Sequence, residues 1–129
     1  MQLPLVVVVE EDGRIAESLT GAQPHRPYCV GSARSGEELR EALRGACPAV
    51  VVVRMARRFV PAAAWLLEHR PGTPLVLVAD HWERDLSFAL LGLGVTACIA
   101  WPEDTEYLTA SVQQVLAGPG RPGRAAGHV

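Results

Sequence analysis

The sequence predicts one α/β domain, in which a single doubly wound parallel sheet of five strands is covered by helices on both faces, a three-layer αβα arrangement. Apolar runs rich in β-branched residues, which are typical of strands buried on both faces, alternate five times with stretches of helical character. The connections between them are short, which favours right-handed crossovers between parallel strands. A length of 129 residues suits one such domain with its own core.

Five apolar runs are the predicted strands. Three of them, Leu5 to Val9, Val50 to Arg54 and Leu75 to Val78, are nearly continuous runs of valine and leucine. Two weaker ones begin at Tyr28-Cys29-Val30 and cover Thr96 to Ala100. The central run ends on a guanidinium, and open α/β sheets gather ligands just beyond the carboxyl ends of their strands. The function of this edge therefore depends on what Arg54 does there.

Helices are predicted between the strands from their capping residues and spacing. Ser35 with Glu38 forms a capping box, Pro61 suits a first helical position, and Asp80 can cap a helix that Gly94 ends. The predicted helices are Gly13 to Thr20, the helix capped by Ser35, Ala62 to Arg70, His81 to Leu93, and about Asp104 to Leu116. Their expected inward residues are Ile15, Leu19, Leu39, Leu43, Ala46, Trp65, Leu108, Val112 and Val115.

Composition excludes several classes of function. The net charge is −2 and all 12 basic residues are arginine, so there is no basic field for nucleic acid or an anionic membrane, and no lysine chemistry. Cys29, Cys47 and Cys98 form no metal or disulfide spacing, and we expect buried free thiols in a reducing cytoplasm. The N-terminus does not read as a signal peptide, and no apolar run approaches the ~20 residues of a membrane span.

Catalytic motifs are not recognisable. A G-x-G-x-x-A match at residues 92–97 runs from helix into strand, whereas dinucleotide binding needs strand into helix. No nucleophile, base and orienting group occur in a usable pattern. We therefore expect no enzyme activity, no cofactor and no metal.

Five segments in order carry a family resemblance: LVVVVEED from Leu5, SGEEL from Ser35, PAVVVVR from Pro48, TPLVLVAD from Thr73, and GVTACIAWP from Gly94. Together they resemble the receiver domain of bacterial response regulators over about residues 5–117. The resemblance implies a flavodoxin-like fold with strand order 2-1-3-4-5. We expect this domain at residues 1–118. The Gly/Pro composition of residues 119–129 predicts a flexible tail or the start of a linker, which could lead to an effector domain.

The resemblance also implies a degenerate phosphorylation site. Receivers bind magnesium with an acidic pair, and only that pair persists. The positions are Glu10 and Glu11 for the pair, Arg54 for the phosphoacceptor aspartate, Ala79 for the hydroxyl residue, Trp101 for the lysine, and Cys98 for the aromatic switch. An arginine is always charged and cannot accept a phosphoryl group on a carboxylate, so we expect it to lie beside the two glutamates and oppose magnesium. The remaining alternative is an unorthodox acceptor such as Asp12 or Asp80.

We therefore expect a pseudo-receiver that acts independently of phosphorylation, in the cytoplasm, by binding a protein partner or a second copy. The expected surface is the fourth helix, fifth strand and fifth helix, which receivers commonly use to pair. Trp82, Trp101 and Tyr107 are candidate anchors, because tryptophan and tyrosine are enriched in interfaces. Alternatively, Trp101 simply covers the sheet edge.

A second hypothesis is a sensor of a small anionic ligand, bound in the crevice at the carboxyl edge of the sheet. Arg54, Arg57 and Arg58 form the candidate anion site. The alternative is that these three residues are one internal ion pair and two solvated arginines.

Overall fold

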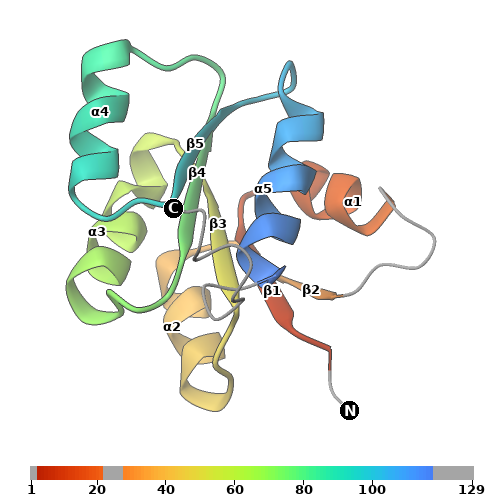
Figure 1. The fold of residues 1–129 in the computed structure, drawn as a ribbon. Coiled ribbons are helices and arrows are strands. Elements are labelled where there is room, and N and C mark those ends of the chain that lie inside the picture. The colour runs from red at the N-terminus through yellow and green to blue at the C-terminus, as the bar shows by residue number, and fades with distance from the viewer. Residues whose placement is uncertain (1–2, 22–27, 118–129) are drawn as a thin grey trace.

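A computed structural model describes residues 3–21 and 28–117, which form one five-stranded parallel sheet with helices on both faces (Figure 1). The strand order is β2-β1-β3-β4-β5. The predicted fold class and strand order are both confirmed. The strands are β1 (Leu5–Val9), β2 (Cys29–Ala33), β3 (Val50–Arg54), β4 (Leu75–Ala79) and β5 (Ala97–Ala100). The helices are α1 (Arg14–Gly21), α2 (Gly36–Gly45), α3 (Val60–His69), α4 (Arg84–Gly92) and α5 (Thr105–Ala117), with a 3₁₀ turn at Arg57–Phe59.

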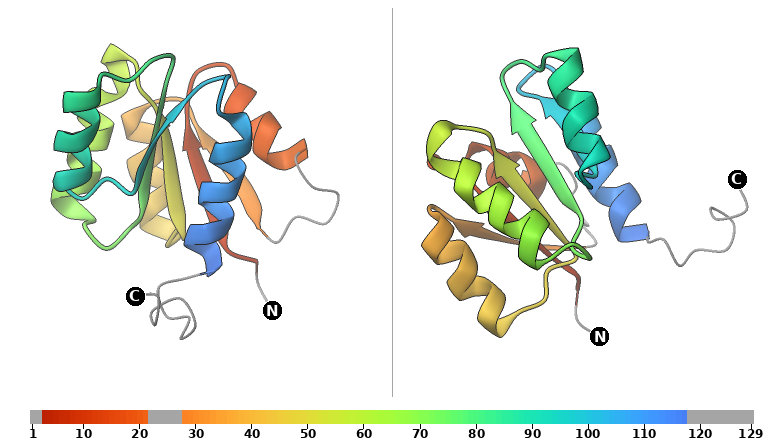
Figure 2. Two further views of the ribbon diagram at one scale, coloured as in Figure 1. Left: turned by 45° about the horizontal axis from the view of Figure 1, so that its top comes forward. Right: turned by 90° about the vertical axis from the view of Figure 1, so that its left-hand side faces the viewer.

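The alternation of side chains along the strands divides the core into two layers. In β1, Val6 and Val8 face α1 and α5, whereas Val7 and Val9 face α2 and α3. Figure 2 shows α1 and α5 on one side of the sheet and α2, α3 and α4 on the other. Because both faces are covered, a continuous run of valine suits these strands better than an alternating pattern.

Two helix ends follow the predicted capping chemistry. The Ser35 hydroxyl accepts a hydrogen bond from the Glu38 backbone N–H at 3.1 Å, and the Glu38 carboxylate accepts one from the Arg34 N–H at 2.9 Å. In a standard capping box the glutamate accepts from the backbone N–H of the N-cap residue. Here Glu38 accepts instead from the preceding residue, Arg34. Gly94 follows α4 with φ 112°, a left-handed conformation that favours glycine.

The start of α4 differs from the prediction. Asp80 does not cap a helix beginning at His81, because its carboxylate is paired with Arg54. The helix begins at Arg84, after an N-cap residue, Glu83, whose side chain makes no capping hydrogen bond.

Three expectations about burial need correction. Cys29 and Cys47 are free but exposed, since β2 is an edge strand and Cys47 follows the end of α2. Cys98 is half-buried, and burial raises the pKa of its thiol despite an opposing hydrogen bond with Ser87. Ala46 is the C-cap residue of α2 and only half-buried. Trp65 is half-buried against the core and stacks on His69 at 5.0 Å between ring centroids.

The other inward residues predicted for the helices are buried, except Val115, which is half-buried against the core. Among the residues that the structure describes, no helix has the length and apolar character needed to cross a membrane. The proposed tail, residues 119–129, lies outside the described residues.

Candidate functional site at the carboxyl edge of the sheet

Four strand ends bring the predicted site residues to one edge of the sheet. Glu10 directly follows β1, Arg54 ends β3, Ala79 ends β4 and Trp101 directly follows β5. Val9 is paired with Val53 in register, so Glu10 and Arg54 leave neighbouring strands at the same level. The sheet therefore brings these four positions to one edge.

Glu10 is buried, with 2% of its surface exposed, and its carboxylate caps helix α1. Oε1 accepts a hydrogen bond from the Ile15 N–H and Oε2 accepts one from the Ala16 N–H, both at 2.8 Å. Backbone N–H groups in the first turn of a helix have no partner within the helix, and a negative charge there is favoured by the helix dipole. Both oxygens of Glu10 are thus engaged by the backbone.

Arg54 pairs with a different carboxylate from the one expected. Its Nη2 donates to Asp80 Oδ1 at 2.9 Å, with 25% of the Arg54 side chain and 81% of the Asp80 side chain exposed. Glu11 pairs instead with Arg58, at 2.6 Å between Oε2 and Nη1. The expectation that Arg54 lies beside both glutamates is therefore corrected: Glu10 is held by α1 and Glu11 by Arg58.

The residues expected as interface anchors differ in exposure. Trp101 is only 9% exposed and its side chain packs with the core layer beneath α1 and α5, while its backbone N–H donates to the Ala79 carbonyl at 2.8 Å. Trp82 is half-buried, and its Nε1 donates to the Ile99 carbonyl at 2.8 Å. Tyr107 alone of the three is strongly exposed, at 68%. The tryptophans are therefore fixed to the sheet, and Trp101 covers its edge.

A different apolar surface lies on α4. Of the nine residues that the structure describes in this helix, none is buried. The sequence gives little signal for this exposure, because RDLSFALLG is apolar without a clear inner stripe. We name this region the α4 apolar surface, which consists of Leu86, Phe88, Leu91 and, just after the helix, Leu93, with exposures of 48, 67, 41 and 68%.

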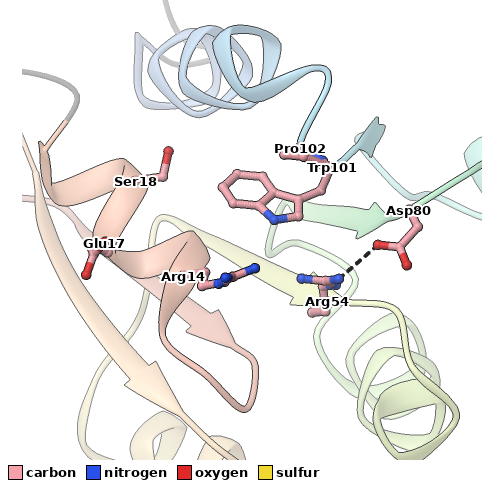
Figure 3. Close-up of a pocket in the computed structure, with 7 residues that line it drawn as sticks. All are labelled: Arg14, Glu17, Ser18, Arg54, Asp80, Trp101 and Pro102. Atoms are coloured by element: carbon pink, nitrogen blue, oxygen red, sulfur yellow. Dashed lines mark hydrogen bonds and ion pairs between the residues drawn. The ribbon is translucent and has the colours of Figure 1, made fainter.

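A cavity of about 440 Å³ opens at the same edge, between α1 and the end of β5 (Figure 3). Of the three arginines expected to form an anion site, only Arg54 lines it. Arg58 lines a separate cavity between α2 and α3, and Arg57 is exposed on the 3₁₀ turn. The lining residues are Arg14, Glu17, Ser18, Arg54, Asp80, Trp101 and Pro102.

Sequence reasoning missed Arg14. A signal for it existed, since Arg14 lies at the start of the helix that follows the first strand. In this topology that helix begins at the carboxyl edge of the sheet.

The side chains at this edge do not fit the divalent cation that the resemblance implies. Magnesium is usually held by one or two free carboxylates together with water and substrate oxygens. Glu10 is engaged by backbone N–H groups, and Glu11 and Asp80 are each paired with an arginine. Within the described part of the chain, no group of three or more His, Cys, Asp and Glu side chains is placed to hold a metal.

Comparisons with known proteins show a similarity in fold to solved structures. No protein-family model and no curated protein matches the sequence. Among solved structures, the chain is similar to the signal receiver domain of a LuxO repressor protein from Vibrio parahaemolyticus (18% identity, 89% of this chain and 91% of that chain covered, TM-score 0.77). A response regulator from Thermotoga maritima is similar at 21% identity (90% and 99% covered, TM-score 0.75).

A third similar structure is the BeF3-activated receiver domain of the nitrogen regulatory protein NtrC, at 20% identity (91% and 97% covered, TM-score 0.72). All three matches cover nearly the whole of both chains. The chain therefore has the flavodoxin-like fold of response-regulator receiver domains.

Proposed function

We propose that this chain is a receiver-type signalling domain that works without phosphorylation and acts, in the cytoplasm, by binding another protein. The observation that carries the proposal is the state of the carboxylates at the site. Glu10 caps α1, Glu11 pairs with Arg58 and Asp80 pairs with Arg54. Receiver-like structures support a role in signal transduction, and we assign no catalysis to this site.

The charge of Arg54 adds a reason against phosphoryl chemistry. A guanidinium has no nucleophilic carboxylate to offer, and it stays protonated at any physiological pH. At roughly 4 Å and an effective dielectric constant near 20, each unit charge of a cation is repelled by about 4 kcal/mol. Arg54 thus disfavours magnesium at the position where an acceptor aspartate would attract it.

The test is addition of beryllofluoride with Mg²⁺, monitored by the backbone amide spectrum. We expect no saturable shift for the residues around Glu10, Arg54 and Ala79, whereas the NtrC receiver domain, which is known in a BeF3-activated form, serves as the positive control. Acetyl phosphate should likewise add no phosphoryl mass. A stable phosphoryl adduct that disappears in Asp12→Asn or Asp80→Asn would contradict the proposal and identify the acceptor.

For the binding surface we propose the α4–β5–α5 side, centred on the α4 apolar surface. The edge strand β5 lies between α4 on one face of the sheet and α5 on the other (Figure 1). Burying apolar surface stabilises a complex by roughly 25 cal/mol per Å², and Phe88 and Leu93 are both more than half exposed. On α5, Tyr107 is also strongly exposed, at 68%.

The first partner to test is a second copy of the chain, because pairing then needs no unidentified protein. We expect reversible self-association in sedimentation velocity, and a monomer for the double variant Phe88→Asp/Leu93→Asp, since a charge in an apolar contact is costly. Val60→Asp on α3 is the matched control, because Val60 is an apolar residue of similar exposure, 47%, on a different helix. A wild-type chain that stays monomeric up to ~1 mM, the Kd at which binding gives only about 4 kcal/mol, would contradict self-pairing.

A further inference from the structure

The cavity at the carboxyl edge combines side chains from four parts of the fold, one of which is Asp80 directly after β4. Arg14 and Ser18 lie one helical turn apart on α1, Arg54 ends β3, and Trp101 with Pro102 joins β5 to α5. Figure 3 shows the guanidinium groups of Arg14 and Arg54 directed into the same space, beside the indole of Trp101.

The lining of this cavity carries two positive and two negative side chains, and they are unevenly placed. Within residues 3–21 and 28–117, no carboxylate lies within 4.0 Å of the Arg14 guanidinium. Arg54 uses one nitrogen for Asp80, and the remaining N–H groups of its five donors are available. The Glu17 carboxylate is at the rim and turned away from both guanidinium groups in Figure 3. Of the two guanidinium groups, that of Arg54 is therefore paired with one carboxylate, Asp80, and that of Arg14 with none among the described residues.

The other walls suit a small molecule better than a macromolecule. A volume of about 440 Å³ lies within the range of roughly 300–1,000 Å³ that is usual for small-ligand sites. Trp101 and Pro102 provide an apolar wall, and Ser18 adds a hydroxyl that can donate or accept. Guanidinium groups recognise carboxylate and phosphate through paired N–H donors.

We infer that this cavity binds a small organic oxyanion, a carboxylate or a phosphate ester, between the guanidinium groups of Arg14 and Arg54, with its apolar part against Trp101 and Pro102. The inference goes beyond the proposed signalling function and does not depend on it. The anion site expected from the sequence, Arg54 with Arg57 and Arg58, is thereby revised to Arg54 with Arg14, because these two arginines line the same cavity. A bound ligand would touch the segment that leads from β5 into α5.

The experiment is an amide-spectrum titration of the full chain with three probes at constant ionic strength: inorganic phosphate, phenyl phosphate and benzoate. We expect saturable shifts at Arg14, Ser18, Arg54 and Trp101 with phenyl phosphate or benzoate. Inorganic phosphate alone tests whether the oxyanion suffices without an apolar part. Absence of saturable shifts with all three probes would overturn the inference.

Two pairs of variants test the two arginines assigned to the cavity. One pair tests for weaker ligand binding and the other for stronger ligand binding. Arg14→Gln should weaken binding about tenfold, the effect of losing about 1.4 kcal/mol, whereas Arg57→Gln, which removes the same charge outside the cavity, should change it less than about twofold.

Asp80→Asn frees Arg54 and should strengthen binding about threefold, whereas the matched charge change Asp85→Asn on α4 should not. Equal effects within either pair would show non-specific charge attraction and overturn the assignment. Because none of these readouts involves a protein partner or phosphorylation, their failure is distinct from failure of the proposed function.

Discussion

Replacing Glu10 with alanine is expected to lower the free energy of unfolding by about 3 kcal/mol, the largest stability effect of any charged residue at this edge. The change leaves the N–H groups of Ile15, which is buried, and of Ala16, which is half-buried, without their acceptors. Hydrogen bonds to a charged group contribute about 1.5–3 kcal/mol each, and some of the loss is recovered by relaxation of the helix end. Urea denaturation measures it.

Glu11→Ala is the matched control, because it removes the same charge from the adjacent residue. Its carboxylate is 58% exposed and pairs with a 59% exposed arginine, so the expected loss is below about 1 kcal/mol. Hydrogen exchange gives a second readout: the amides of Ile15 and Ala16 should exchange faster in Glu10→Ala only. Equal loss of stability in the two variants would contradict the capping role of Glu10.

Trp101→Ala is expected to lower the free energy of unfolding by about 3 kcal/mol, toward the lower end for a tryptophan removed from a core. Trp101 is 9% exposed and packs with Ile99 and Leu108 in the layer beneath α1 and α5. It also forms a wall of the cavity, so the change enlarges a space that is already open to solvent. Chemical denaturation of the purified variant gives the magnitude.

Tyr107→Ala provides the comparison on neighbouring α5. Its side chain is 68% exposed, and surface substitutions of this kind usually change stability by less than about 0.5 kcal/mol. If the two variants lost the same stability, Trp101 would not be the edge-covering residue that its burial indicates. If Trp101→Ala lost none, the sheet edge would be held by other contacts.

The arrangement of the strands was predictable because it depends on runs of residues and not on single contacts. Valine runs at β1 and β3 can be satisfied only by burial on both faces, and this requirement calls for helices on each side. The cap at Ser35 and the glycine stop at Gly94 are local devices that act within a few residues. These features are readable along the chain, and the structure agrees with them.

The pairing of charges was not predictable in the same way. Arg54 could have met Glu10, Glu11 or Asp80, and the choice depends on where each carboxylate finds its strongest partner. The start of α1 presents backbone N–H groups in a buried place, and they take Glu10 because leaving them unpaired there is costly. Asp80 pairs with Arg54 and does not cap α4.

The sequence by itself determined the doubly wound sheet, the edge to which the site residues come, and the arginine that ends the central strand at residue 54. Only the tertiary structure decided that Arg14 joins Arg54 around a cavity, that Trp101 is buried, and that α4 leaves its apolar side chains exposed. The reason is physical: strand patterns are fixed by burial over many residues, whereas a side chain's partner depends on competition among groups that are distant in sequence and close in space.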